Sequence, residues 1–446
     1  MSIFVSELYN MVDTVYVGRE IGAKAIGALT IAFPIQRLII AIGLLIAVGA
    51  STAVARSLGE GNSEKLKHIV SNAIALMLVI ISLLVIFIYI FKTPIIYYLG
   101  ATESIFPYAN EYISIVIFGG VFQCFTVIIG YILTSLGNAK TNLIATVIGA
   151  MCNIIIDYFL VVMFSFGIKG AAIATVSSQI ISSVYAFYHF LKIKDKFNVS
   201  LGFSLNKGIT YSILTVGFST FIIEISDAVV AVVLNNVLNS QGDMAIIIVG
   251  VVTRVSMFLF ITVIGVASAM QPIAAYNYGA KNFKRLKEVV SSSMKAVMLT
   301  SSLLWLIVLV FANPILATFV KEKDILMEAV KAFRIVISVF PSVGIYFVAI
   351  YYYQAIEEPK LSLLLSIYRQ LLLFIPLLFI MVRMFGLVGA WIAYPVSDLL
   401  SAITGVYYII KAKQDMKERY EELQLIKKNN KNENKFKPIM ADFNKA

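Results

Sequence analysis

The segment that starts at residue 59 reads Gly59-Glu-Gly-Asn-Ser-Glu-Lys-Leu-Lys-His-Ile-Val-Ser71, and its pattern returns as Gly279-Ala-Lys-Asn-Phe-Lys-Arg-Leu-Lys-Glu-Val-Val-Ser291. The glycine, asparagine, leucine, second lysine, valine and serine positions are identical at an offset of about 220 residues. A single match of this kind arises by chance, so the offset has to recur elsewhere before it indicates a repeat.

The offset does recur along the chain. A spacing that stays nearly constant over five blocks indicates two homologous halves. The further matches are Phe91–Ile95 with Phe311–Ile315, Tyr131 with Tyr351, Lys140 with Lys360, and Gly167–Ala174 with Gly386–Ala393.

The composition places this repeat in a membrane. Hydrophobic residues make up 60% of the 446 residues, charged residues 14%, and the mean hydropathy is +0.89. Ordinary globular proteins have about 45–50% and 25% of these classes. The balance excludes an aqueous enzyme, a disordered chain and a coiled coil, and the apolar stretches are long enough for helices rather than barrel strands.

Twelve apolar stretches follow one another, and the interior ones carry the roughly 20 residues that cross a bilayer. We expect an all-α polytopic membrane protein with two pseudo-symmetric lobes of six helices. Six is even, so both lobes have the same orientation, and we expect them to face each other across a central cleft near the membrane midplane, as alternating access requires. The expected spans lie near 1–18, 28–54, 69–91, 110–135, 141–165, 170–192, 209–236, 243–272, 289–311, 330–355, 362–382 and 387–410.

The first span is irregular. Helix 7 is expected to begin near 209, so its counterpart in the first lobe should begin before Met1. About 18 residues at ~1.5 Å each cover roughly 27 Å, barely the ~30 Å hydrocarbon core. We therefore expect that helix 1 is truncated, either because Met1 is not the native start or because the helix is short.

Basic residues mark one side of the membrane. Most Lys and Arg residues of the loops lie in the even-numbered loops and in the tail, and the even-numbered loops lead even without the tail. The positive-inside rule then places the tail in the cytoplasm. We expect an N-lobe at 1–191, a cytoplasmic inter-lobe linker at 192–208, a C-lobe at 209–410 and a polar cytoplasmic tail at 411–446.

Several kinds of chemistry are poorly supported. The two cysteines and two histidines fit no disulfide framework, metal-ligand pattern or catalytic triad. The Gly59–Gly61 loop lacks the Lys-Ser/Thr of a phosphate-binding loop. The net charge of +11 is spread over loop ends and tail, which argues against nucleic acid. We expect no catalytic residues, no metal and no cofactor. Because no primary pump motif is present, we expect that any transport draws its energy from an ion gradient.

Two polar residues share one face of the predicted fifth helix. Asn153 and Asp157 are spaced i,i+4. A carbonyl and a carboxylate together suit a hard cation such as Na⁺. Burial disfavours the charged form of a carboxylate, so this group could instead take a proton. The alternative is a buried polar network that only packs the N-lobe.

The predicted seventh helix carries its own acid pair, Glu224 and Asp227, three residues apart. Anionic groups in a cleft favour cationic cargo, and ion pairs with Arg254 or Arg334 are the alternative. Met257 and Tyr351 are of the types that line an adaptable drug surface, although such residues more often face lipid or core. The roles of five charged groups within spans remain open, with structural ion pairs as the alternative: Arg37, Arg254, Arg334, Arg369 and Asp398.

Taken in order, five segments resemble the MATE family, the multidrug and toxic compound extrusion transporters, and in particular its bacterial multidrug-efflux branch. The resemblance covers nearly the whole chain, and its specificity lies in the order and spacing of the segments. They are Leu8–Gly18, Gly49–Asn62, Asn153–Asp157, Gly170–Thr175 and Gln271–Ala280.

The resemblance implies a twelve-helix fold whose two lobes form a V-shaped central cleft, and it implies a secondary antiporter of the bacterial cytoplasmic membrane. Such a protein exports bulky, mostly cationic lipophilic compounds by alternating access, in exchange for inward Na⁺ or H⁺. The family pattern adds Asp13 and Thr175 to Asn153 and Asp157 as cation-coupling residues. A polar partner that some relatives carry on helix 4 has no clear match, and Gln123 and Thr126 are the nearest candidates.

Two other functions compete with this reading. A lipid-linked oligosaccharide flippase of the same superfamily would need several basic residues facing the cleft, whereas the N-lobe candidates are acidic and the spans number twelve rather than fourteen. A membrane-embedded enzyme would need a catalytic constellation that the sequence does not supply. We expect a monomer whose partners are small molecules and the bilayer.

Overall fold

The computed structural model describes residues 12–14, 16–197, 205–239, 243–319 and 322–443, and every regular element in these ranges is a helix. The predicted first span falls largely outside them, although 12–14 and 16–20 are helical. The first-lobe elements are α2 (Ala23–Glu60), α3 (Ser63–Ile90), α4 (Lys92–Tyr98), α5 (Phe106–Ser135), α6 (Ala139–Asp157), the π-helix η1 (Tyr158–Met163), α7 (Gly167–Lys194) and the 3₁₀-helix η2 (Asp195–Phe197).

The second lobe follows the same plan. Its elements are α8 (Lys207–Asn239), α9 (Asp243–Gly279), α10 (Phe283–Val310), α11 (Ala312–Ala317), α12 (Lys323–Val336), α13 (Phe340–Ala355), α14 (Pro359–Ile367), the π-helix η3 (Tyr368–Phe374), α15 (Ile375–Phe385) and α16 (Leu387–Phe443).

The predicted fold class is confirmed. Within the described residues, ten helices are long and apolar enough to cross a membrane, and α12 with α13, bent by 48° at their junction, supplies an eleventh. Each lies where an apolar stretch of the sequence predicted a span.

The internal repeat is visible in the backbone. Asn62 and Asn282 cap α3 and α10 in the same way, because each side chain accepts a hydrogen bond from the backbone N–H three residues later. Left-handed residues also recur at matching places. They pair as Gly61 with Lys281, Gly137 with Glu357, and Gly167 with Gly386.

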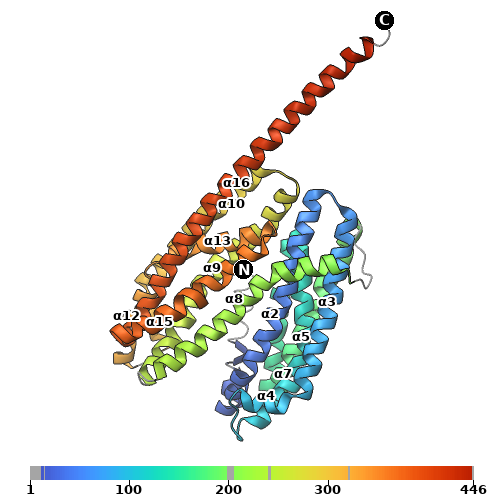
Figure 1. Cartoon of the computed structure of the whole chain (residues 1–446). Helices are drawn as coiled ribbons and strands as arrows, with labels where there is room; N and C mark the ends of the chain where they lie inside the picture. The colour runs from blue at the N-terminus through green and yellow to red at the C-terminus, as the bar shows by residue number, and fades with distance from the viewer. Residues whose placement is uncertain (1–11, 15, 198–204, 240–242, 320–321, 444–446) are drawn as a thin grey trace.

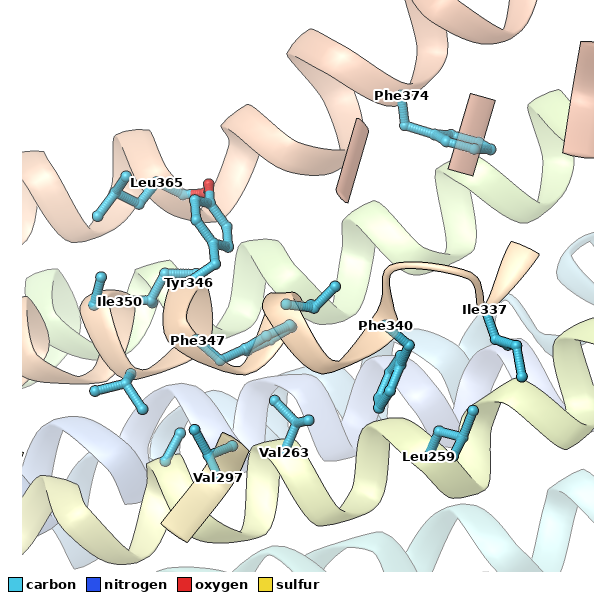
Figure 2. Close-up of a cluster of buried hydrophobic side chains, with 14 of the residues drawn as sticks. Leu259, Val263, Val297, Ile337, Phe340, Tyr346, Phe347, Ile350, Leu365 and Phe374 are labelled. Carbon is cyan, nitrogen blue, oxygen red and sulfur yellow. The ribbon is translucent and has the colours of Figure 1, made fainter. Parts of the chain in front are cut away.

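Each lobe has its own hydrophobic core. One cluster of buried apolar residues, apart from Ile213 of α8, lies between Val17 and Phe190, and the other, apart from Ala55, lies between Leu234 and Met416. Figure 2 shows part of the second core, where Phe347 of α13 lies close to Val263 of α9. This core reaches beyond 410, because α16 continues unbroken and buries Ala412 and Met416.

The lobes meet along α2, which packs against α8 and α9. In Figure 1, α8 runs diagonally from the first lobe to the second. Backbones come close at four glycines, where a Cβ atom would overlap a main-chain carbonyl of the other helix. The contacts are Gly49 with Ile213, Gly217 with Leu45, Gly59 with Tyr276, and Gly279 with Arg56.

A buried polar network reinforces this contact. The Nε2 atom of Gln271 donates to Thr52 Oγ1 at 2.9 Å and to Gln354 Oε1 at 3.1 Å. The Nε2 atom of Gln354 donates in turn to Ser219 Oγ at 2.8 Å and to Thr220 Oγ1 at 3.2 Å. The network joins α2 of the first lobe to α8, α9 and α13, and its partners satisfy amides that would be costly to bury alone.

An ion pair lies at the same end of the molecule. Arg56 of α2 pairs with Glu357, which also accepts a hydrogen bond from Ser212 Oγ at 3.0 Å. Glu357 has φ 55°, a conformation that favours glycine, and its repeat counterpart is Gly137. The contacts with Arg56 and Ser212 thus hold a charged residue at a position where the repeat itself uses glycine.

The close helix contact gives a first prediction. Gly217→Ala should lower the apparent melting temperature in detergent, because its Cβ would collide with the Leu45 carbonyl. The free energy of unfolding should fall by about 1–3 kcal/mol, as is typical of overpacking. Gly250→Ala is the matched control, since a Cβ there meets open space. Equal melting temperatures for the two variants would show that backbone contact does not constrain the lobe interface.

Candidate functional site

The first candidate site lies inside the N-terminal lobe. Asp157 ends α6 and is fully buried, and Asp13 of the helical stretch 12–14 is 8% exposed. The two carboxyl groups lie close enough to interact with each other. Asn153, one turn before Asp157, is also fully buried. The structure therefore brings together three residues that the sequence predicted as one site.

Several polar atoms of this site lack hydrogen-bond partners within the described chain. Apart from the contact between the two carboxyl groups, no partner is present for either oxygen of Asp157, for either amide atom of Asn153 or for Oδ1 of Asp13. Unpaired polar atoms of this kind are expensive in a protein interior. A cation or a proton would relieve the cost, and carboxylate and amide oxygens are suitable ligands for Na⁺.

Thr175, the fourth predicted member, lies on α7 and is buried, and its hydroxyl donates to the Ala171 carbonyl at 3.0 Å. Tyr112 of α5 connects it to the acids. The buried Tyr112 side chain lies near Thr175, Gln36 and both carboxyl groups. Tyr112 and Gln36 were not predicted, because neither has a sequence neighbour among the other site residues.

A local irregularity adjoins the site. The π-helix η1 begins at Tyr158, directly after Asp157. Such widened turns are often found at functional sites. The C-terminal lobe has a longer one, η3, in the corresponding helix.

The C-lobe acids have partners different from those predicted. Glu224 pairs with Arg37 of α2 at 3.9 Å, with both side chains about one-third exposed. Asp227 is exposed and accepts a hydrogen bond from Gln370 Nε2. Neither acid forms an ion pair with Arg254 or Arg334 in the described part of the chain, where both arginines are exposed.

The remaining intramembrane charges form a buried ion pair. Arg369 of η3 donates from Nη1 to Asp398 Oδ1 of α16 at 3.1 Å. Its guanidinium also lies 4.9 Å from the ring centre of Phe260 and 5.7 Å from that of Phe347. The structural ion pair anticipated for these residues is therefore present.

The other predicted cleft residues are scattered. Gln123 accepts a hydrogen bond from Gln179 Nε2 at 3.3 Å. Met257 is 37% exposed on α9, whereas Tyr351 is 5% exposed and sits near Glu224 and Tyr131. Tyr131 and Tyr351 are repeat counterparts, and in their helices Tyr131 is half-buried and Tyr351 is buried.

Comparison with known proteins agrees with this architecture. The MatE family model matches residues 1–159 and 216–380. "Multidrug export protein MepA" of Staphylococcus saprophyticus is 24% identical over 91% of this chain and 90% of its own length. "FAD transporter" of Shewanella oneidensis is 25% identical over 90% of this chain and 89% of its own.

Solved structures share the fold. The outward-facing conformation of a multidrug resistance MATE family transporter of the MOP superfamily superposes with a TM-score of 0.88, at 24% identity, over 94% of both chains. The family match spans most of both lobes and bears out the resemblance found in the sequence. The chain belongs to the MatE family, and it is a membrane transporter rather than an enzyme.

Proposed function

We propose that this protein is a secondary antiporter that exports bulky, mostly cationic lipophilic compounds in exchange for inward Na⁺ or H⁺. The observation that carries the proposal is the buried contact between Asp13 and Asp157, with unpaired amide atoms of Asn153 beside it. The names of the relatives support export of multiple drugs.

Charge and desolvation explain how the acid pair would act. Two adjacent carboxylates in a dry lobe repel each other and lose hydration, so a bound cation or proton stabilises the closed arrangement. The stretch that carries Asp13 would then repack against α6 and α7. Antiport requires that this binding oppose substrate binding, a negative coupling between two sites.

The lipid-linked oligosaccharide flippase gains no support from the comparisons. A flippase for anionic pyrophosphate cargo would need free basic groups facing the cleft. Arg37 and Arg369 are instead paired with Glu224 and Asp398. The positive charges of these two arginines are largely neutralised by carboxylates of the protein itself.

The proposal includes a membrane orientation. Basic loops and the α16 extension on one side indicate a cytoplasmic tail in a multi-pass protein of the bacterial cytoplasmic membrane. We propose a monomer with Asp13, Asn153, Asp157 and Thr175 as the coupling site. Glu224, Asp227, Gln123, Met257 and Tyr351 would contribute to the substrate path.

The coupling site gives a second prediction. Asp13→Asn and Asp157→Asn should each reduce efflux of a fluorescent lipophilic cation from proteoliposomes by about 5- to 150-fold, the range of typical coupling energies. Na⁺ and pH gradients are imposed separately. Asp195→Asn is the control, because that side chain is 83% exposed. If both site variants show wild-type efflux at equal protein content, the coupling site does not lie in the N-terminal lobe.

A third prediction concerns cargo charge. Glu224→Gln removes the negative charge that Glu224 would offer to cationic cargo, so transport of a lipophilic cation should fall roughly fivefold, equivalent to about 1 kcal/mol. Transport of a neutral compound and of the anion FAD should not fall. Glu328→Gln, at an exposed pair on α12, is the control. An equal loss for all three compounds would argue against a charge role for Glu224.

A further inference from the structure

The C-terminal lobe has an acid cluster organised differently from that of the N-terminal lobe. Arg369 and Gln370 are adjacent in η3, yet they reach opposite neighbours. Arg369 holds Asp398 of α16, and Gln370 donates to Asp227 of α8. One short π-helical segment thus supplies a partner for each of two carboxylates.

The repeat makes the difference informative. The first and fifth helices of the N-terminal lobe bring Asp13 to Asp157, and no described side chain offers them a positive charge. The corresponding helices of the C-terminal lobe are α8 and the α14–η3–α15 helix, which bring Asp227 to Gln370 with Arg369 beside it. The first and fifth helices therefore carry no cationic side chain beside their acids in the N-terminal lobe, whereas in the C-terminal lobe the fifth helix carries the cationic side chain of Arg369.

The guanidinium is held as a bound organic cation would be. It is bracketed by the Asp398 carboxylate and the rings of Phe260 and Phe347, a combination of carboxylate and aromatic faces that recognises cations. The backbone carbonyl of Arg369 accepts a hydrogen bond from Ser397 Oγ at 2.9 Å, which fixes the segment against α16. Figure 2 shows Phe347 within the core beneath this segment.

We propose that Arg369 is a built-in counter-ion, which takes in the C-terminal lobe the part that the coupling cation takes in the N-terminal lobe. Arg369 neutralises Asp398 throughout the cycle, whereas the carboxylate of Asp227, which accepts its hydrogen bond from the neutral amide of Gln370, keeps its charge for a cationic substrate. The transporter then needs a coupling cation in one lobe only. The comparison with the N-terminal lobe rests on the function proposed above.

The test uses Arg369→Gln and Arg369→Lys, each made in the full-length Asp13→Asn/Asp157→Asn protein. This background removes the N-terminal acids, so cation effects that remain arise elsewhere. The apparent melting temperature is measured against Na⁺ at constant ionic strength and, separately, against pH. Arg369→Gln should become cation-dependent, with a melting temperature that rises with Na⁺ or with acid, because Asp398 has lost its counter-ion. Arg369→Lys keeps the positive charge and should remain as insensitive as the parent.

Each outcome decides the question. A folded Arg369→Gln variant with no cation dependence overturns the proposal, as does equal cation dependence in Arg369→Lys. If Arg369→Gln is unstable, high Na⁺ or acid must rescue it, and instability that neither relieves also overturns it. The same titration of the otherwise wild-type protein tests the N-terminal site: if Asp13→Asn/Asp157→Asn leaves its cation response unchanged, the proposed coupling site fails while the Arg369 result stands by itself.

Discussion

Two buried carboxyl groups, those of Asp13 and Asp157, lie next to each other inside a helical lobe without a basic partner in the described chain. A charged group in a bilayer costs about 2.5–3.5 kcal/mol on insertion scales. We propose that a cation or a proton accompanies this contact, because either one would offset that cost. The other intramembrane acids have partners: Glu224 has Arg37, Asp227 has Gln370 and Asp398 has Arg369.

The helix α2 links this contact to the rest of the molecule. It carries Gln36 beside Tyr112 of the site, Arg37 opposite Glu224, and Thr52 and Arg56 in the contacts between the lobes. A helix moves as a nearly rigid unit over such a length. A displacement of α2 at the acid pair would therefore alter the Arg37–Glu224 pair and the Arg56–Glu357 pair together. The glycine contacts with α8 and α9 limit how far it can shift without separating the lobes.

The sequence predicted the fold well because the fold is set by patterns within the chain. Apolar length fixed the spans, and the 220-residue offset predicted two lobes that share capping asparagines and left-handed turns. The i,i+4 spacing alone placed Asn153 and Asp157 on one helix face. The family resemblance was needed to add Asp13 and Thr175, since they lie on other helices.

What the sequence could not predict are pairings between helices. Glu224 was expected to pair with Arg254 or Arg334 if it paired at all, yet its partner is Arg37, far away in sequence on α2. Tyr112 joins the site through α5, and the π-helical turns that aim Arg369 and Gln370 in different directions have no composition signal. Such contacts depend on which helices pack against each other and in what orientation. The composition of an apolar stretch specifies that packing only weakly.

The most direct measurement of the central claim is the affinity of purified protein for a fluorescent lipophilic cation, titrated at rising Na⁺ with ionic strength fixed, and again at falling pH. If occupancy of the Asp13–Asp157 contact opposes substrate binding, the wild-type dissociation constant should rise by about 5- to 150-fold along one of the two titrations. Asp13→Asn and Asp157→Asn should each remove that dependence. An affinity that responds equally to the coupling ion in the wild type and in both variants would contradict the account.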